Sequence, residues 1–210
     1  LVKEGYKEIT LLGQNVNSYR DGDVDFPALL DMVASVEGNF RLRFMTSHPK
    51  DFSARLVAVM TKHDKILNLL HLPAQSGSTR ILRLMNRRYT REEYLEKVAL
   101  LKREIPEAEI TTDLIVAFPT ETEEEFEETL SLVKEADFAS AFTFIYSPRT
   151  GTEAAKMEGR ISDEVAKDRI TRLVACVNEN TRRKSEKYVG REIEVLCEDF
   201  DEKRGLYLGR

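Results

Sequence analysis

The sequence predicts an α/β fold built on a parallel sheet, and three observations support this class. Short apolar segments alternate with stretches of helical spacing along most of the chain, as is typical of parallel strands joined by crossover helices. Polar side chains follow directly after these apolar segments, at the strand ends where parallel sheets bind ligands. The 210 residues, 41% of them hydrophobic, are enough for one core and a small additional piece.

The first half of the chain is expected to alternate strand and helix. Apolar runs at 9–12, 41–46 and 66–72 predict strands. Apolar residues at helical spacing predict a helix at 26–37, which Gly38 would end. Ser53 is placed to cap the next helix. The last of the three strands runs into a polar turn at 75–78 and then into a helix that begins at Ser78.

The second half continues the alternation and then changes character. Thr90 and Glu93 have the spacing of a capping box, and the helix they begin is expected to end at Pro106. Strands at 110–116 and 141–146 flank an acidic helix, and a long helix is expected at 163–188. Beyond Gly190, alternation at 193–197, a turn at 199–204 and a return strand at 206–208 predict the start of an all-β module. We therefore expect domains at 1–187 and 188–210.

Composition narrows the function classes. The net charge of -5 argues against indiscriminate nucleic-acid binding. No apolar run reaches the ~20 residues of a membrane span, so we expect a cytoplasmic protein without membrane contact. Cys176 and Cys197 lack a Cys or His at ligand spacing, so we expect no metal site from this chain. Basic residues cluster at 80–91 and 182–191, where either a phosphate-tracking patch or a solvated helix face would explain them.

Polar residues after the strands are the first candidates for a site. They are Gln14, Asn15, Ser47, Gln75, Ser76, Ser78, Glu121, Tyr146 and Arg149. In a curved parallel sheet these exits would gather on one rim and line one pocket. A simpler alternative stays open for the turn at 75–78, in which Ser78 caps a helix and Gly77 makes the turn. Because no acid–base pair, activated nucleophile or metal triad is visible, the chemistry must come from a bound group.

Five segments carry a resemblance to a known family. They are LLGQNVNSY at 11–19, TSHPKDF at 46–52, HLPAQSGSTRILRLMNRRYTREEY at 71–94, TTDLIVAFPTETEEEF at 111–126 and FTFIYSPRTGT at 142–152. In this order they resemble the radical-SAM methylthiotransferases. Within that family, the first and third segments are most similar to the tRNA enzymes that act on isopentenyladenosine.

The resemblance implies a fold, a reaction and cofactors. The fold would be a partial (β/α) TIM-like barrel that lacks its first strand, with 188–210 as the first hairpin of a small β-barrel called TRAM. The reaction would insert a methylthio group at carbon 2 of isopentenyladenosine next to the anticodon. S-adenosylmethionine (SAM), two [4Fe-4S] clusters in the full-length protein and an electron donor such as flavodoxin or ferredoxin would be required.

Two rival functions stay open beside this one. A sibling methylthiotransferase would act on threonylcarbamoyladenosine in tRNA or on a ribosomal protein. A non-catalytic RNA-binding barrel would have kept the fold and lost the cluster.

The sequence departs from the family pattern in two respects. The cluster-binding CxxxCxxC motif is absent. We expect it to lie upstream of Leu1, and the chain to be a fragment that cannot cleave SAM alone. Ala117 and Thr120 stand where the family usually has glycine, which bears on the turn beside the SAM adenine.

Roles transfer residue by residue from the resemblance. SAM would be held by Gln14, Asn15, Ser47, Gln75, Ser76, Ser78, Asp113, Phe118 and Glu121. The tRNA anticodon loop would contact Asn17, Arg87, Arg88, Tyr146, Arg149, Arg182 and Arg183. No catalytic side chain is predicted.

Overall fold

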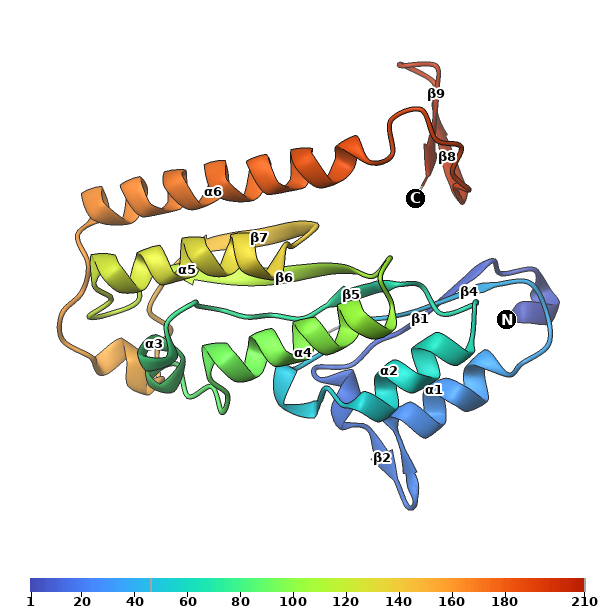
Figure 1. Ribbon diagram of the computed structural model, residues 1–210, viewed down its shortest axis with the longest axis horizontal. Helices are drawn as coiled ribbons and strands as arrows, with labels where there is room; N and C mark the ends of the chain where they lie inside the picture. The colour runs from blue at the N-terminus through green and yellow to red at the C-terminus, as the bar shows by residue number, and fades with distance from the viewer. Residues whose placement is uncertain (46, 210) are drawn as a thin grey trace.

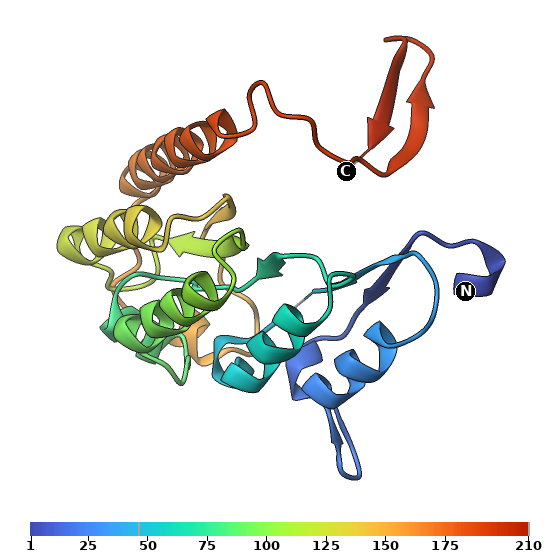
Figure 2. The same ribbon diagram turned by 45° about the vertical axis from the view of Figure 1, so that its right-hand side comes forward.

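A computed structural model describes residues 1–45 and 47–209 of the chain. Thr46, which belongs to the predicted motif at 46–52, and Arg210, the last residue of the predicted C-terminal module, lie outside the described residues. The described part is a curved row of strands with helices along its convex side, followed by a hairpin that projects from the end of the last helix (Figures 1 and 2).

The row of strands is parallel throughout, as the sequence predicts. β1 (Glu8–Leu11) pairs with β4 (Arg41–Phe44), and β6 (Glu109–Val116) pairs on either side with β5 (Leu69–His71) and β7 (Ser140–Ile145). A parallel bridge between Leu42 and Ile66 joins the two sheets, with the Leu67 amide donating to the Leu42 carbonyl at 2.9 Å. The carboxyl ends of all five strands therefore lie at one edge.

Each α-helix begins directly after a residue whose side chain caps it. The helices are α1 (Phe26–Ala34), α2 (Ala54–Lys62), α3 (Thr79–Leu84), α4 (Arg91–Glu104), α5 (Glu123–Ala136) and α6 (Asp163–Glu186). The Ser53 hydroxyl caps α2, and the predicted capping box at Thr90 and Glu93 begins α4. Across the described ranges, no helix is both long and apolar enough to cross a membrane.

The predicted end of the first helix is wrong by a few residues. α1 ends at Ala34, because the Ser35 hydroxyl bonds back to the Asp31 carbonyl at 2.8 Å and closes the last turn. Gly38 is not the helix cap that the sequence predicts. Its φ of +126° places it against Val2, whose Cγ1 would be 2.4 Å from an added Cβ.

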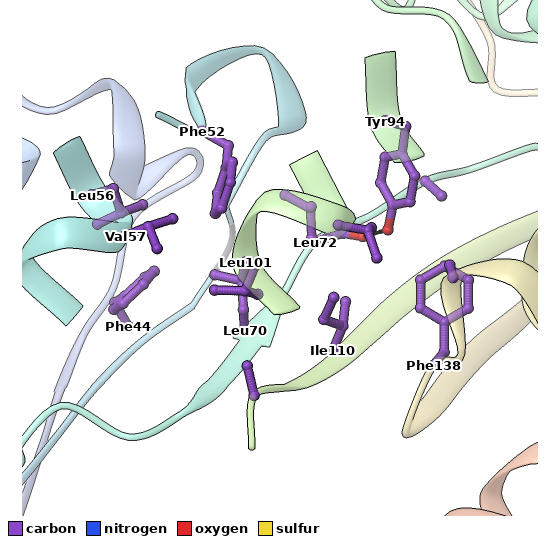
Figure 3. Close-up of a cluster of buried hydrophobic side chains, with 14 of the residues drawn as sticks. Phe44, Phe52, Leu56, Val57, Leu70, Leu72, Tyr94, Leu101, Ile110 and Phe138 are labelled. Carbon is purple, nitrogen blue, oxygen red and sulfur yellow. Dashed lines mark hydrogen bonds between the residues drawn. The ribbon is translucent and has the colours of Figure 1, made fainter. Parts of the chain in front are cut away.

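One face of the sheet is packed and the other is open. Along β6 the burial alternates strictly, so Ile110, Leu114 and Val116 face the helices. Figure 3 shows the resulting core, in which Phe44, Phe52, Leu56 and Val57 meet Leu70, Leu72 and Leu101, with Tyr94 and Phe138 at the other end. Each large apolar side chain buried there stabilises the fold by about 1.5–3 kcal/mol.

Short elements complete the connections. They are the 3₁₀ turns η1 (Val2–Glu4), η2 (Val16–Ser18), η3 (Pro49–Asp51) and η4 (Glu153–Lys156), and a small hairpin of β2 (Arg20–Asp21) and β3 (Val24–Asp25). This hairpin is not among the predicted elements, and it turns at Gly22 with a φ of +56°. All of these connections leave the parallel order of the main strands unchanged.

The C-terminal hairpin is shifted relative to its prediction. β8 (Cys197–Asp201) pairs antiparallel with β9 (Leu206–Gly209), so the strand begins where the predicted one ends. The amides of Arg204 and Gly205 both donate to the Asp201 carbonyl, and Gly205 has a φ of +64°. This tight turn connects the two paired strands. The alternation at 193–197 that predicts a strand lies, up to residue 196, in a segment without regular secondary structure.

Candidate functional site

The exits of β1 and β4 are joined by side-chain hydrogen bonds. Asn15 Oδ1 accepts from the His48 amide at 3.3 Å, and Asn15 Nδ2 donates to Asp51 Oδ2 at 2.5 Å. Ser47 Oγ donates to Asn17 Oδ1 at 3.1 Å. The two loops therefore form one polar unit at the carboxyl edge of the sheet.

Aromatic and backbone contacts extend this unit to the exits of β5 and β6. The His48 ring packs edge-on against Tyr89 at 5.7 Å, and the Tyr89 hydroxyl donates to the Ala74 carbonyl at 3.0 Å. The Gln75 amide donates to the Asp113 carbonyl at 2.8 Å, and this bond holds the segment after β5 against β6. Gln75 is buried in this position, at 7% exposure.

The exits of β6 and β7 close the far side of the edge. The rings of Phe118 and Tyr146 lie 4.9 Å apart, edge to face. Glu121 Oε2 accepts from the Ala117 amide at 2.8 Å and from Arg169 Nη1 at 2.9 Å. The strand exits thus converge on one edge, as expected, and Gln14 and Arg149 lie exposed in two of the same loops.

Ala117 and Thr120, where the resemblance predicts glycine, adopt left-handed backbone. Ala117 has a φ of +59° and Thr120 a φ of +67°, in the turn between β6 and α5. This conformation costs a residue with a Cβ on the order of 1 kcal/mol, so glycine would suit both positions. The turn is held by the loop after β7, where the Gly159 carbonyl accepts from the Thr120 amide at 2.8 Å. The loop after β7 therefore supports the left-handed turn at Thr120.

The turn at 75–78 has a clear internal role. Ser78 caps α3 by accepting from the Ile81 amide, and its hydroxyl donates to Glu125 Oε1 at 3.0 Å. Ser76 Oγ accepts from the Ser78 amide at 3.1 Å. The alternative that Ser78 caps a helix is therefore confirmed, while SAM binding by Ser76 and Ser78 stays a prediction.

The ionisation of Glu125 is expected to make the stability of the fold depend on pH. Hydrogen bonds from Arg80, two of them at 2.6 Å, are the main reason that the pKa of Glu125 falls from its ordinary 4.5 to about 2. A depressed pKa contributes stability above pH 4.5 that is lost as the pH falls towards 2. We expect Arg80→Met to flatten the fall in urea midpoint across this window. Arg83→Met, which removes an exposed arginine on the same helix, should leave the slope unchanged. Equal slopes for both variants would contradict this account.

Three buried polar atoms at this edge have no hydrogen-bond partner among the described residues. They are Asn17 Nδ2, Glu121 Oε1 and Tyr146 OH. Buried polar groups are normally satisfied, so such orphans mark places where a ligand or water would bind. A carboxylate oxygen such as that of Glu121 suits the hydroxyl and amino groups of SAM, for which Glu121 is predicted. The amide of Asn17 and the phenol of Tyr146 suit a polar nucleoside of the RNA, for which those two residues are predicted.

The open face of the sheet carries Asp113, which is predicted to hold SAM, together with His71, Phe142 and Phe144, for which no role is predicted. His71 Nε2 lies 3.6 Å from Asp113 Oδ2, and the rings of His71 and Phe142 are 6.2 Å apart. Phe142 and Phe144 are 60% and 50% exposed. Phe142 and Phe144 are two residues apart in β7, so both lie on the face of the sheet that is turned away from the helices. This spacing is the pattern in the sequence that could have predicted their place.

The predicted RNA-contacting arginines divide between the two ends of the sheet. Arg87 and Arg88 lie at the carboxyl edge, close to His48. Arg183 is paired with Asp137, which caps the end of α5 three residues before β7 and so lies at the amino edge. Arg182, one residue before it, pairs within α6. An RNA role for each of these residues stays a prediction.

The described residues do not fit an iron–sulfur cluster. Within the described ranges, no group of three or more His, Cys, Asp or Glu side chains is arranged to hold a metal ion. Cys176 Sγ lies 3.8 Å from the Leu130 carbonyl between α5 and α6, whereas Cys197 is exposed on the hairpin. No reaction step is therefore assigned to a cluster held by these residues.

An open parallel sheet with helices on one side and ligand-competent groups at its carboxyl edge defines a partial (β/α)-barrel domain. A family model described as the Radical SAM superfamily matches residues 1–133. The chain belongs to this superfamily. The fold agrees: coproporphyrinogen III oxidase from Escherichia coli superposes with a TM-score of 0.58, covering 72% of this chain and 36% of that one at 19% identity.

Curated relatives are much more similar in sequence. A protein of Thermodesulfovibrio yellowstonii named tRNA-2-methylthio-N(6)-dimethylallyladenosine synthase is 52% identical over 202 residues, covering 96% of this chain and 47% of its own length. A protein of the same name from Clostridium perfringens is 53% identical over 201 residues, covering 94% of this chain and 45% of its own. The chain thus spans about half the length of these relatives.

Proposed function

We propose that the chain is the radical-SAM core of a tRNA methylthiotransferase, which inserts a methylthio group at carbon 2 of isopentenyladenosine next to the anticodon. The observation that supports this most directly is identity of 52% and 53% to relatives named for that product, over 94–96% of the chain. Residues 1–187 form the partial barrel, and 188–210 begin a TRAM-like RNA-binding module.

The residues of this chain would bind and orient the reactants. SAM, with an iron–sulfur cluster that the described residues do not provide, supplies the radical chemistry of the superfamily. Asn17, Gln75 and Tyr146 are placed at the carboxyl edge to hold polar groups of the nucleosides. Holding two reactants at a fixed distance and angle lowers the barrier without any acid or base from the protein. This fits an edge that contains many polar groups and no predicted catalytic side chain.

The partners follow from the same proposal. The substrate is tRNA, whose target base must leave its stack to reach the sheet edge, and Arg87 and Arg88 would hold the phosphates of the anticodon loop. An electron donor such as flavodoxin or ferredoxin reduces the cluster, and the enzyme works in the cytoplasm.

Mass spectrometry of tRNA from a strain without the gene tests the proposal. We expect the methylthio mark on isopentenyladenosine to disappear and the unmodified isopentenyladenosine to accumulate, with both restored when the whole gene is returned. The mark on threonylcarbamoyladenosine in the same sample is the internal control. Loss of that second mark instead would identify a sibling enzyme, and no change in either would refute the proposal.

A further inference from the structure

A small polar pocket lies where the exit of β4 meets the segment between α3 and α4. Its volume is about 160 Å³, and it is lined by Asn15, His48, Lys50, Asp51, Asn86 and Arg88. Asn86 turns the chain there with a φ of +57°. The pocket is part of the carboxyl edge, beside the predicted SAM residue Asn15.

The imidazole of His48 is held in one orientation inside this pocket. Its Nδ1 accepts from the Lys50 amide at 3.1 Å and so caps the 3₁₀ turn η3. The opposite side of the ring packs against the buried Tyr89. The direction of His48 Nε2 is therefore fixed by the fold.

His48 Nε2 faces Arg87 Nη1 at 3.4 Å, an arrangement that lacks an acceptor. Burial, followed by the charge of Arg87, lowers the pKa of His48, with Asp51 opposing this effect and Lys50 adding to it, which favours the neutral ring. A neutral imidazole has one acceptor nitrogen, and the Lys50 amide uses it. The other nitrogen must carry hydrogen. Two N–H donors therefore point at each other, and neither finds an acceptor among the described residues.

The charges around the pocket favour an anion. Three cations, Lys50, Arg87 and Arg88, stand against one carboxylate, Asp51. That carboxylate is already engaged by Asn15 Nδ2 at 2.5 Å and lies 4.0 Å from Lys50 Nζ. The pocket and the adjoining Arg87 therefore carry a net positive charge.

We propose that this pocket binds one phosphodiester group of the substrate RNA, whose oxygens accept from His48 Nε2–H and from an N–H of the Arg87 guanidinium, with Arg88 and Lys50 neutralising the rest of its charge. This deepens the proposed function and rests on it. A phosphate held beside Asn15 would set the distance from the RNA backbone to the nucleoside site. His48 is a positioning residue, because it touches the backbone of the RNA and not the reacting base.

The test is the affinity of the whole protein for a synthetic anticodon stem-loop. Asn reproduces the Nδ1 acceptor of histidine and has no group at the Nε2 position, so His48→Asn keeps the η3 cap and removes the donor. We expect binding to weaken about five- to tenfold with an unchanged salt slope, because a neutral donor is lost. Arg87→Gln should weaken binding and lower the slope of log K against log salt by about 1. His63→Asn and Arg103→Gln, at the amino edge, are the matched controls.

Each outcome bears on the proposal. If both pocket variants bind the stem-loop like the wild type while the protein still modifies tRNA, the pocket assignment is wrong and the proposed function stands. If the wild type neither binds the stem-loop nor restores the methylthio mark, both are wrong. Inorganic phosphate, followed through the His48 ring signals by NMR with chloride as control, separates the ligand sources. Phosphate binding without any effect of the variants on RNA would assign the pocket to a free anion and overturn the phosphodiester.

Discussion

Replacing Gly77 with alanine is expected to lower the free energy of unfolding by about 3 kcal/mol, because the new methyl group meets backbone that cannot move aside. A Cβ at this position would lie 2.3 Å from the Glu128 carbonyl oxygen and 2.5 Å from Thr129 Cα. The Gly77 amide also donates to Thr129 Oγ1 at 2.9 Å, which holds the turn against α5. Relief of the clash must shift either α5 or the turn that carries Gln75.

Urea unfolding followed by circular dichroism measures the loss. Gly13→Ala is the matched control, because its Cβ would make only an ordinary contact, 3.4 Å from Val16 Cα. SAM affinity of the whole protein should fall for Gly77→Ala and hold for Gly13→Ala. A Gly77→Ala protein as stable as the control would show that the turn and α5 are less tightly packed than the structure indicates.

Replacing Arg169 with methionine is expected to lower the free energy of unfolding by about 3–5 kcal/mol at neutral pH, because it leaves a buried carboxylate without its counter-charge. Arg169 is 4% exposed and Glu121 2%. Arg169 Nη1 donates to the carboxylate of Glu121 at 2.9 Å and to its carbonyl at 3.1 Å, and Phe126 packs under the guanidinium. Methionine fills much of the volume of the arginine side chain but carries no positive charge.

The deficit should shrink as the pH falls. Burial raises the pKa of Glu121 above its ordinary 4.5, while the Ala117 amide and Arg169 lower it. A raised pKa means that protonation favours the folded state, so this contribution is fully present below 4.5 and is lost as the pH rises through the folded value. Without Arg169 the pKa rises further, and acid relieves the charge. Urea midpoints at pH 5 and pH 8 measure this, and adding Glu121→Gln should recover part of the loss. A deficit independent of pH would assign the effect to packing alone.

Local patterns were sufficient to predict most of the fold. Ser53 and Thr90 cap the helices they were expected to cap, because a hydroxyl before an apolar-periodic run acts over three residues only. The parallel sheet follows from the alternation of strand and helix. The prediction is wrong at the ends of two elements, because contacts with other segments of the chain set those ends. Gly38 lies against Val2, and β8 begins opposite Gly209.

The sequence was sufficient to predict at which edge of the sheet the candidate site lies, but not which side chains contact one another there. Every strand exit that the sequence marks does lie there, because parallel strands bring their carboxyl ends together. The partners of those side chains are long-range: Arg169 reaches Glu121 across 48 positions, and Arg87 meets His48 across 39. No local pattern contains such pairs, so the pocket beside His48 was visible only in three dimensions.

The strands of the parallel row lie side by side in the order in which they are synthesised, β1, β4, β5, β6 and β7. Each new strand therefore docks on one that has already been synthesised, and none has to wait for a later segment to fill a gap. The sheet can grow stepwise while the ribosome is still delivering the chain, which shortens the time that unpaired apolar edges spend exposed to aggregation. α6 is made after the last of these strands, and it brings Arg169 to the buried carboxylate of Glu121 at the exit of β6.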